Sequence, residues 1–177
     1  MTSKQSLVAT AVGVIFIGIA VLSRVLPHPL NFTPLTAIAL FGGVYFSKRL
    51  AFVVPMAALL ISDSILGFYG MMPWVYGSFL AAGLIGYFIR GRKSVLTVSA
   101  GTLVSSILFF LVTNFGVWAS GTMYLHSWAG LLECYTAAIP FFRNSFAGDV
   151  VFVAAMFGLY EGSLRLIAFR SKEVIAR

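Results

Sequence analysis

Three polar side chains, Asp63, Asn114 and Asp149, interrupt stretches that otherwise consist largely of leucine, isoleucine, valine, phenylalanine and alanine. The surrounding apolar runs are long enough to cross a bilayer, where an ionisable group is costly unless it faces a bundle interior or a water-filled cavity. No nucleophile–base pair with readable spacing accompanies them, so the chemistry they suggest is binding rather than catalysis. The pattern therefore predicts a polar site inside a membrane domain.

The composition is typical of an integral membrane protein built from helices. Of 177 residues, 60% are hydrophobic and 10% charged, with a mean hydropathy of +0.98, whereas a soluble domain carries roughly a quarter charged residues. Continuous apolar runs favour helices over a β-barrel, whose strands alternate in polarity. No hydrophilic stretch is long enough for a second domain, so residues 1–177 are expected to form one all-α membrane domain.

Six segments are apolar enough to be transmembrane helices, which predicts a polytopic helical bundle. They cover residues 7–25, 34–46, 50–69, 73–89, 94–118 and 146–167, and a long outer loop covers residues 119–145. The first segment resembles a signal peptide in position. We interpret it as a retained helix, because its apolar run is long and no clear cleavage site precedes Arg24.

The basic residues predict the orientation of these helices. Ten of the twelve fall on one set of connections and termini, and only Arg24 and Arg143 fall on the other. The positive-inside rule then places both termini in the cytoplasm, as in a multi-pass protein of the bacterial cytoplasmic (inner) membrane. Topology thus explains the net charge of +7 better than binding to nucleic acid does. The ten are Lys4, Lys48, Arg49, Arg90, Arg92, Lys93, Arg165, Arg170, Lys172 and Arg177.

The second segment is short and begins with a strong helix-start signal. Asn31 and Phe32 precede Thr33, which suits the N-cap position, and Pro34, which suits the first helical position. Residues 34–46 make a helix of about 20 Å, shorter than the hydrocarbon core of about 30 Å. We therefore expect its positive N-terminal end to face a cavity below the outer surface.

With this orientation, the three polar residues all fall in the outer half of the membrane. Each also has a structural interpretation. Asp149 is expected in the first turn of its helix, where an acid stabilises the dipole. Asp63 is expected mid-span, and could form an ion pair with Arg24 or Arg143. Asn114 could form a hydrogen bond across helices.

The candidate substrate site combines these residues with polar and aromatic groups from the outer connections. Trp118 fits an aromatic belt at the membrane interface as well as it fits a binding pocket. The site residues are Asp63, Asn114, Asp149, Asn31, Thr33, Arg143 and Trp118.

We expect neither a catalytic site nor a bound cofactor or metal. The sequence contains no HExxH, GxSxG or P-loop motif. His28 and His126 are not at helical ligand spacing from the acids. The single Cys134 excludes an intrachain disulfide and any CxxC motif.

Small residues recur at four-residue spacing in several predicted spans, which allows helices to approach closely. The series Ser78, Ala82 and Gly86 is expected to pack within the bundle. Ala9 and Gly13 lie on the first span, which has no ionisable residue between Lys4 and Arg24 and could face a partner.

Two short motifs carry a family resemblance. The stretch from Asn31 to Gly43, NFTPLTAIALFGG, resembles the second-span region of an uncharacterised bacterial membrane family. The stretch from Ile61 to Gly67, ISDSILG, is similar to that family's third span. In its layout of six short spans and long outer loops, the chain resembles the S components of energy-coupling factor (ECF) transporters, to which that family is related.

The resemblance implies a function and a set of partners. It implies capture of a vitamin-like small molecule at the outer face, in a pocket closed by the first, third and fifth loops. It also implies a separate membrane coupling subunit with two ATPases, which small residues of the first span contact; Ala9 and Gly13 are the matching positions. A larger residue, Ile17, stands where the small-residue run would continue.

The leading hypothesis is therefore a substrate-binding membrane subunit of a small-molecule importer. The alternative is a small structural or assembly subunit of a larger membrane complex, in which Asp63 and Asp149 are packing or ion-pair residues. A third possibility is a binding protein or transporter that acts without a coupling subunit. A membrane enzyme would need a nucleophile–base pair that the sequence does not contain.

Overall fold

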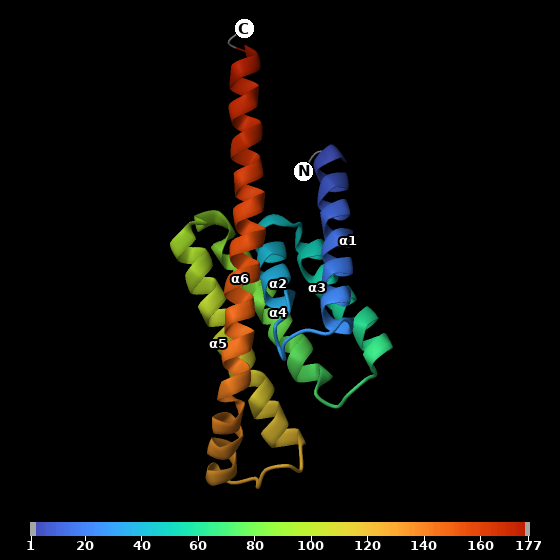
Figure 1. Cartoon of the computed structure of the whole chain (residues 1–177), viewed down its shortest axis with the longest axis vertical. Coiled ribbons are helices and arrows are strands. Elements are labelled where there is room, and N and C mark those ends of the chain that lie inside the picture. Colours follow the sequence, from blue (N-terminus) through green and yellow to red (C-terminus); the bar gives the residue numbers. More distant parts are fainter. Residues whose placement is uncertain (1–2, 176–177) are drawn as a thin grey trace.

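The computed structural model is a helical bundle in which successive helices run in opposite directions, so that α1 begins and α6 ends at the same end (Figure 1). The structure describes residues 3–175, with the side chains of residues 7, 9–165 and 169. The predicted all-α fold class is confirmed over this part of the chain. The helices are α1 (Ser3–Val25), α2 (Leu35–Tyr45), α3 (Lys48–Leu66), α4 (Met72–Ile89), the 3-10 turn η1 (Arg90–Arg92), α5 (Val95–Ser120) and α6 (Trp128–Ile175).

Four helical stretches are long and apolar enough to cross a membrane, which supports the assignment as a membrane protein. Two further apolar helical stretches within the described residues, Ala9–Val25 and Leu35–Tyr45, are shorter. The four are Lys48–Leu66, Met72–Arg92, Val95–Ser120 and Trp128–Arg165. The side chains of Lys4, Arg170, Lys172 and Arg177, which were used to predict the orientation, lie outside the described ones.

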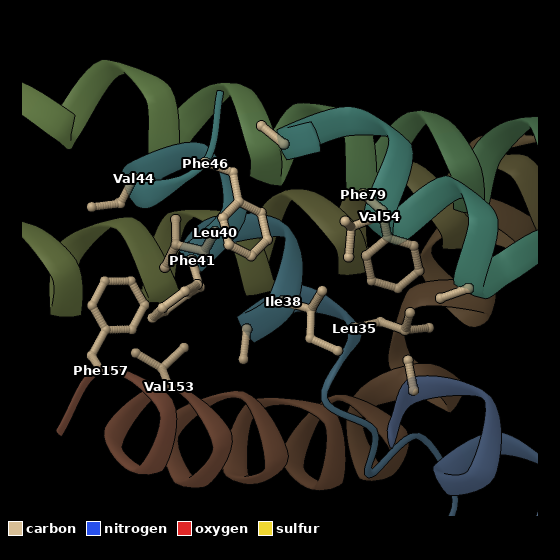
Figure 2. Close-up of a cluster of buried hydrophobic side chains, with 14 of the residues drawn as sticks. Leu35, Ile38, Leu40, Phe41, Val44, Phe46, Val54, Phe79, Val153 and Phe157 are labelled. Carbon is tan, nitrogen blue, oxygen red and sulfur yellow. The ribbon is translucent and has the colours of Figure 1, made fainter. Parts of the chain in front are cut away.

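Helix α2 forms the core of the bundle. Its residues from Leu35 to Val44 are all buried, because the helix is apolar on every side and contacts α3, α4, α5 and α6. Figure 2 shows Phe41 of α2 beside Phe157 of α6, and their ring centroids are 5.2 Å apart. Phe16 of α1 meets Phe41 from another side, also at 5.2 Å. The short helix is thus enclosed by the longer ones.

Glycines allow α2 and α4 to touch backbone to backbone. A Cβ atom built on Gly86 would lie 2.2 Å from the carbonyl oxygen of Leu40, and one on Gly43 would lie 2.2 Å from that of Gly83. Ser78 and Ala82 are buried on α4 as well, so the predicted packing of this small-residue series is confirmed.

Arg90 closes the other end of α2. Its Nε and Nη2 atoms donate hydrogen bonds to the Gly43 carbonyl at 3.0 and 2.7 Å, and Nη2 also donates to the Phe46 carbonyl. The guanidinium thereby satisfies carbonyls that the helix end leaves without partners and stabilises the negative end of the dipole.

The largest correction to the sequence analysis concerns the outer loop predicted over residues 119–145. This prediction is wrong for most of its length, because only residues 121–127 separate α5 from α6. Pro140 lies inside α6. A proline usually ends a helix, because it cannot donate a backbone hydrogen bond. Membrane-spanning helices nevertheless tolerate proline where neighbouring groups bind the carbonyl that it leaves without a partner. At 1.5 Å per residue, α6 is about 72 Å long and extends beyond the bundle (Figure 1).

Other boundaries move by a few residues. Helix α3 ends at Leu66 rather than at residue 69, with Gly67 as its C-cap at a φ of 101°. Pro34 takes the N-cap position of α2, one residue later than predicted, and no side chain caps this helix, so the cap assigned to Thr33 is wrong. Such shifts are common at helix ends.

Replacing Gly86 by alanine should destabilise the bundle by about 1–3 kcal/mol or more, because the new methyl group would collide with the Leu40 carbonyl. Thermal unfolding in detergent should show a lower midpoint. Gly77→Ala on the same helix is the matched control, since a Cβ atom there meets nothing within 4 Å. Equal midpoints for the two variants would contradict the close α2–α4 contact.

Candidate functional site

A cavity of about 290 Å³ lies at the N-terminal end of α2. Each of the six α-helices, and two of the connections between them, contribute residues to its wall. Its apolar lining includes Leu59, Val75, Phe79 and Phe109. Its polar lining consists of Arg24, His28, Asn31, Thr33, Thr36, Tyr69, Ser145 and Asp149.

The start of α2 points into this cavity. Leu35 and Thr36 of the first turn line it, as does Thr33 just before the helix. The geometry thus agrees with a short second helix whose positive end faces a cavity. Asn31 has a φ of 60°, a left-handed conformation that asparagine tolerates better than most residues, and it also lines the cavity.

Asp149 reaches the cavity from the middle of α6. The side chain is buried, with 2% exposed, and Oδ2 accepts a hydrogen bond from Ser106 Oγ of α5 at 2.6 Å. The hydroxyl of Thr36 is a second hydrogen-bonding partner. Because α6 begins at Trp128, Asp149 does not lie in a first turn. The interpretation of Asp149 as a capping acid is therefore wrong.

Asp63 forms an ion pair beside the cavity and is not among the residues that line it. Its carboxylate is fully buried in the last turn of α3, and its Oδ1 lies 2.6 Å from Nη2 of Arg24. The tyrosine hydroxyl of Tyr76 donates to Oδ2 at 2.8 Å. Arg24 also donates to Ser62 and lines the cavity itself. Of the two predicted ion-pair partners, the structure selects Arg24.

Tyr69 borders both the ion pair and the cavity. Burial chiefly, and the nearby Asp63 carboxylate to a lesser degree, raises the pKa of Tyr69 above its ordinary value, while Arg24 opposes this shift. The tyrosine therefore stays protonated at neutral pH. Because Arg24 donates a hydrogen bond to its oxygen, the hydroxyl can act toward a bound molecule as a donor.

Asn114 lines a second, neighbouring cavity of about 250 Å³. The two cavities share Asn31, Val75, Phe109 and Ser145. The amide of Asn114 donates to the Phe110 carbonyl of its own helix at 2.8 Å, so the predicted hydrogen bond of this side chain across helices is not formed.

Two predicted site residues, Trp118 and Arg143, line neither cavity. Trp118 Nε1 donates to the Leu125 carbonyl at 2.9 Å, and its ring meets that of His126 at 5.6 Å. It thereby fixes the connection between α5 and α6. Arg143 is exposed on α6. The structure thus separates these two side chains from Asn31, Thr33 and Asp149.

Sequence reasoning missed several cavity residues, among them Thr36, Tyr69 and Ser145. Ser145 lies four residues before Asp149, which puts the two on one helix face. That signal was hidden because residues 119–145 were interpreted as a loop. No comparable signal marks Ser106, since serine is common in membrane helices as a partner of its own backbone.

The two residues that the resemblance assigns to a partner contact have a different role in the structure. Ala9 and Gly13 are buried, and a Cβ atom on Gly13 would lie 2.9 Å from Val54 Cγ2 of α3. Gly13 permits a close approach of α1 to α3, and Ala9 lies one turn before it on the same helix face. The exposed face of α1 carries Leu7, Val14, Ile15, Ile19 and Leu22 instead.

Within the described residues, no group of three or more His, Cys, Asp or Glu side chains is placed to hold a metal ion. Cys134 is buried, and its thiol donates to the Asn114 carbonyl at 3.4 Å.

Replacing Arg24 by methionine should cost about 3–5 kcal/mol of stability, because it leaves the Asp63 carboxylate buried without its cation. The double variant with Asp63→Asn should lose less than the sum of the two single losses, as measured by chemical unfolding in detergent. Lys93→Met is the control: its pair with Glu161 is over a third exposed, so its loss should stay below about 1 kcal/mol. Additive single losses would contradict a coupled pair.

Comparisons with known proteins identify the family of the chain, and nothing more specific. No curated protein and no solved structure matches it. A protein-family model described as a family of unknown function, DUF6580, matches residues 4–169, which is nearly the whole chain. The chain therefore belongs to the DUF6580 family.

Proposed function

We propose that the chain is a substrate-binding integral membrane subunit for uptake of a vitamin-like small molecule captured from the outer face. The observation that carries the proposal is the polar cavity at the N-terminus of α2, with the buried carboxylate of Asp149 in its wall. A volume of about 290 Å³ is close to the lower end of the range for small-molecule sites. The polar groups converge there from elements far apart in the sequence.

The proposal includes a topology. The chain has six transmembrane helices and both termini in the cytoplasm, in the cytoplasmic (inner) membrane of a bacterium. The alternating helix directions support this arrangement, because α1 begins and α6 ends at one end of the bundle (Figure 1). The basic turn Arg90–Arg92 lies at that same end and suits the cytoplasmic side. The cavity then opens toward the outer side.

Uptake also needs a source of energy. The sequence contains no P-loop, so a separate membrane coupling subunit with two ATPases completes the importer in this proposal. Because Ala9 and Gly13 are buried, with Gly13 packed against α3, the coupling subunit would meet the exposed apolar face of α1. That face includes Val14 and Ile15, which are 63% and 58% exposed.

Mass spectrometry of small molecules released from the purified, denatured protein tests the binding function. A metabolite should be present at near-stoichiometric level and should be lost in Ser145→Trp, since Ser145 lines both cavities and an indole would fill them. Ala147→Trp is the matched control, because Ala147 is exposed two residues further along α6. An empty protein in all three preparations would instead favour a structural or assembly subunit.

Cysteine labelling tests the topology, starting from a Cys134→Ala background. Met123→Cys, at a position that is 78% exposed between α5 and α6, should react with a membrane-impermeant maleimide in intact spheroplasts. Gly91→Cys, in the exposed turn η1, should react only after lysis. The reverse pattern would overturn the proposed orientation.

A further inference from the structure

Two charged side chains in the cavity wall differ in whether they have an ion-pair partner. Arg24 and Asp149 both line the cavity. Arg24 is neutralised by Asp63 at 2.6 Å and is also bound by Ser62 and Tyr69. An anionic ligand would have to compete with that buried pair for the guanidinium.

Asp149 has no such cation. Among the described side chains, its hydrogen-bonding partners are the hydroxyls of Ser106 and Thr36, and no basic group forms an ion pair with it. Arg143, the basic residue that precedes it on α6, is exposed. Burying a carboxylate without a counter-charge is costly, and this cost is repaid when a ligand brings a cation to it.

The N-terminus of α2 adds positive character to a cavity whose lining also includes the imidazole of His28. A helix end acts as roughly half a unit charge, so it offsets only part of the charge of an ionised Asp149. The charge of an ionised Asp149 is therefore only partly offset, because neither Arg24 nor His28 forms an ion pair with it among the described side chains. The rings of Phe79, Phe109 and Tyr69 also line the cavity, and aromatic faces attract cations.

We infer that the substrate is a small organic cation whose charged nitrogen, an amine or a quaternary ammonium, lies beside Asp149. This inference rests on the proposed function and names its substrate class. The neighbouring cavity takes the uncharged part of the molecule, because it shares Asn31 and Ser145 with the first cavity and adds Met71, Phe110 and Phe142 to the wall.

Three probes of one shape test the charge preference: benzylamine as the cation, benzyl alcohol as the neutral form and benzoate as the anion. Their binding is measured by ligand-observed NMR and calorimetry on the protein in nanodiscs of zwitterionic lipid, with empty nanodiscs subtracted. Benzylamine should bind roughly tenfold or more tightly than the other two, as expected for a buried charge pair.

Asp149→Asn should abolish this preference, because it keeps an oxygen for Ser106 and removes the charge. Glu133→Gln, an exposed acid on the same helix, is the matched control and should bind as the unaltered protein does. If Asp149→Asn does not fold, the order of the three probes on the unaltered protein still decides.

The outcomes separate this inference from the proposed function. Tighter binding of benzoate or benzyl alcohol, or a preference for benzylamine that survives Asp149→Asn, would overturn the cationic class. If that binding is nevertheless lost in Ser145→Trp and kept in Ala147→Trp, the binding function itself still holds. If no probe binds and the purified protein releases no metabolite, both proposals fail.

Discussion

Lipid offers no hydrogen bonds, and this constraint decides where the polar side chains of the bundle lie. The two buried acids show two ways of meeting it. Asp63 is charge-paired with Arg24 and bound by Tyr76, which ties the ends of α1 and α3 and the body of α4 together. Asp149 relies on hydroxyls from α5 and α2. Each acid joins three helices, α1, α3 and α4 for Asp63 and α2, α5 and α6 for Asp149, so the polar groups also fix the arrangement of the bundle.

The enclosure of α2 follows from the same constraint. A helix of 11 residues is shorter than the hydrocarbon region is thick, so at least one of its ends needs polar partners within the protein. Arg90 supplies them at the C-terminal end by binding the carbonyls of Gly43 and Phe46. At the N-terminal end no side chain caps the helix, and the cavity lies there instead. The short helix thus creates a polar opening that the surrounding helices then line.

The sequence predicted the all-helical class and picked out both acids, because a charge within an apolar run is costly wherever it lies. It also predicted that the start of the second helix faces a cavity, from the length of one segment and from Thr33 and Pro34. It failed at α6, where residues 119–145 were interpreted as a loop although the helix begins at Trp128 and continues through Pro140. The hydroxyls that meet Asp149 could not be found, because which helix faces bring Ser106 and Thr36 to it depends on packing between distant segments.

Because α6 begins at Trp128 and not near residue 146, the role of Asp149 has to be explained differently. In a first turn, the carboxylate would be explained by its own helix dipole. In the middle of a helix, with its own N–H groups already bonded along the helix, the same side chain has no such explanation. Asp63 at the end of α3 forms an ion pair with Arg24 of the same chain. A buried acid that the protein solvates with hydroxyls and leaves beside a cavity is therefore the feature of this fold that packing alone does not require.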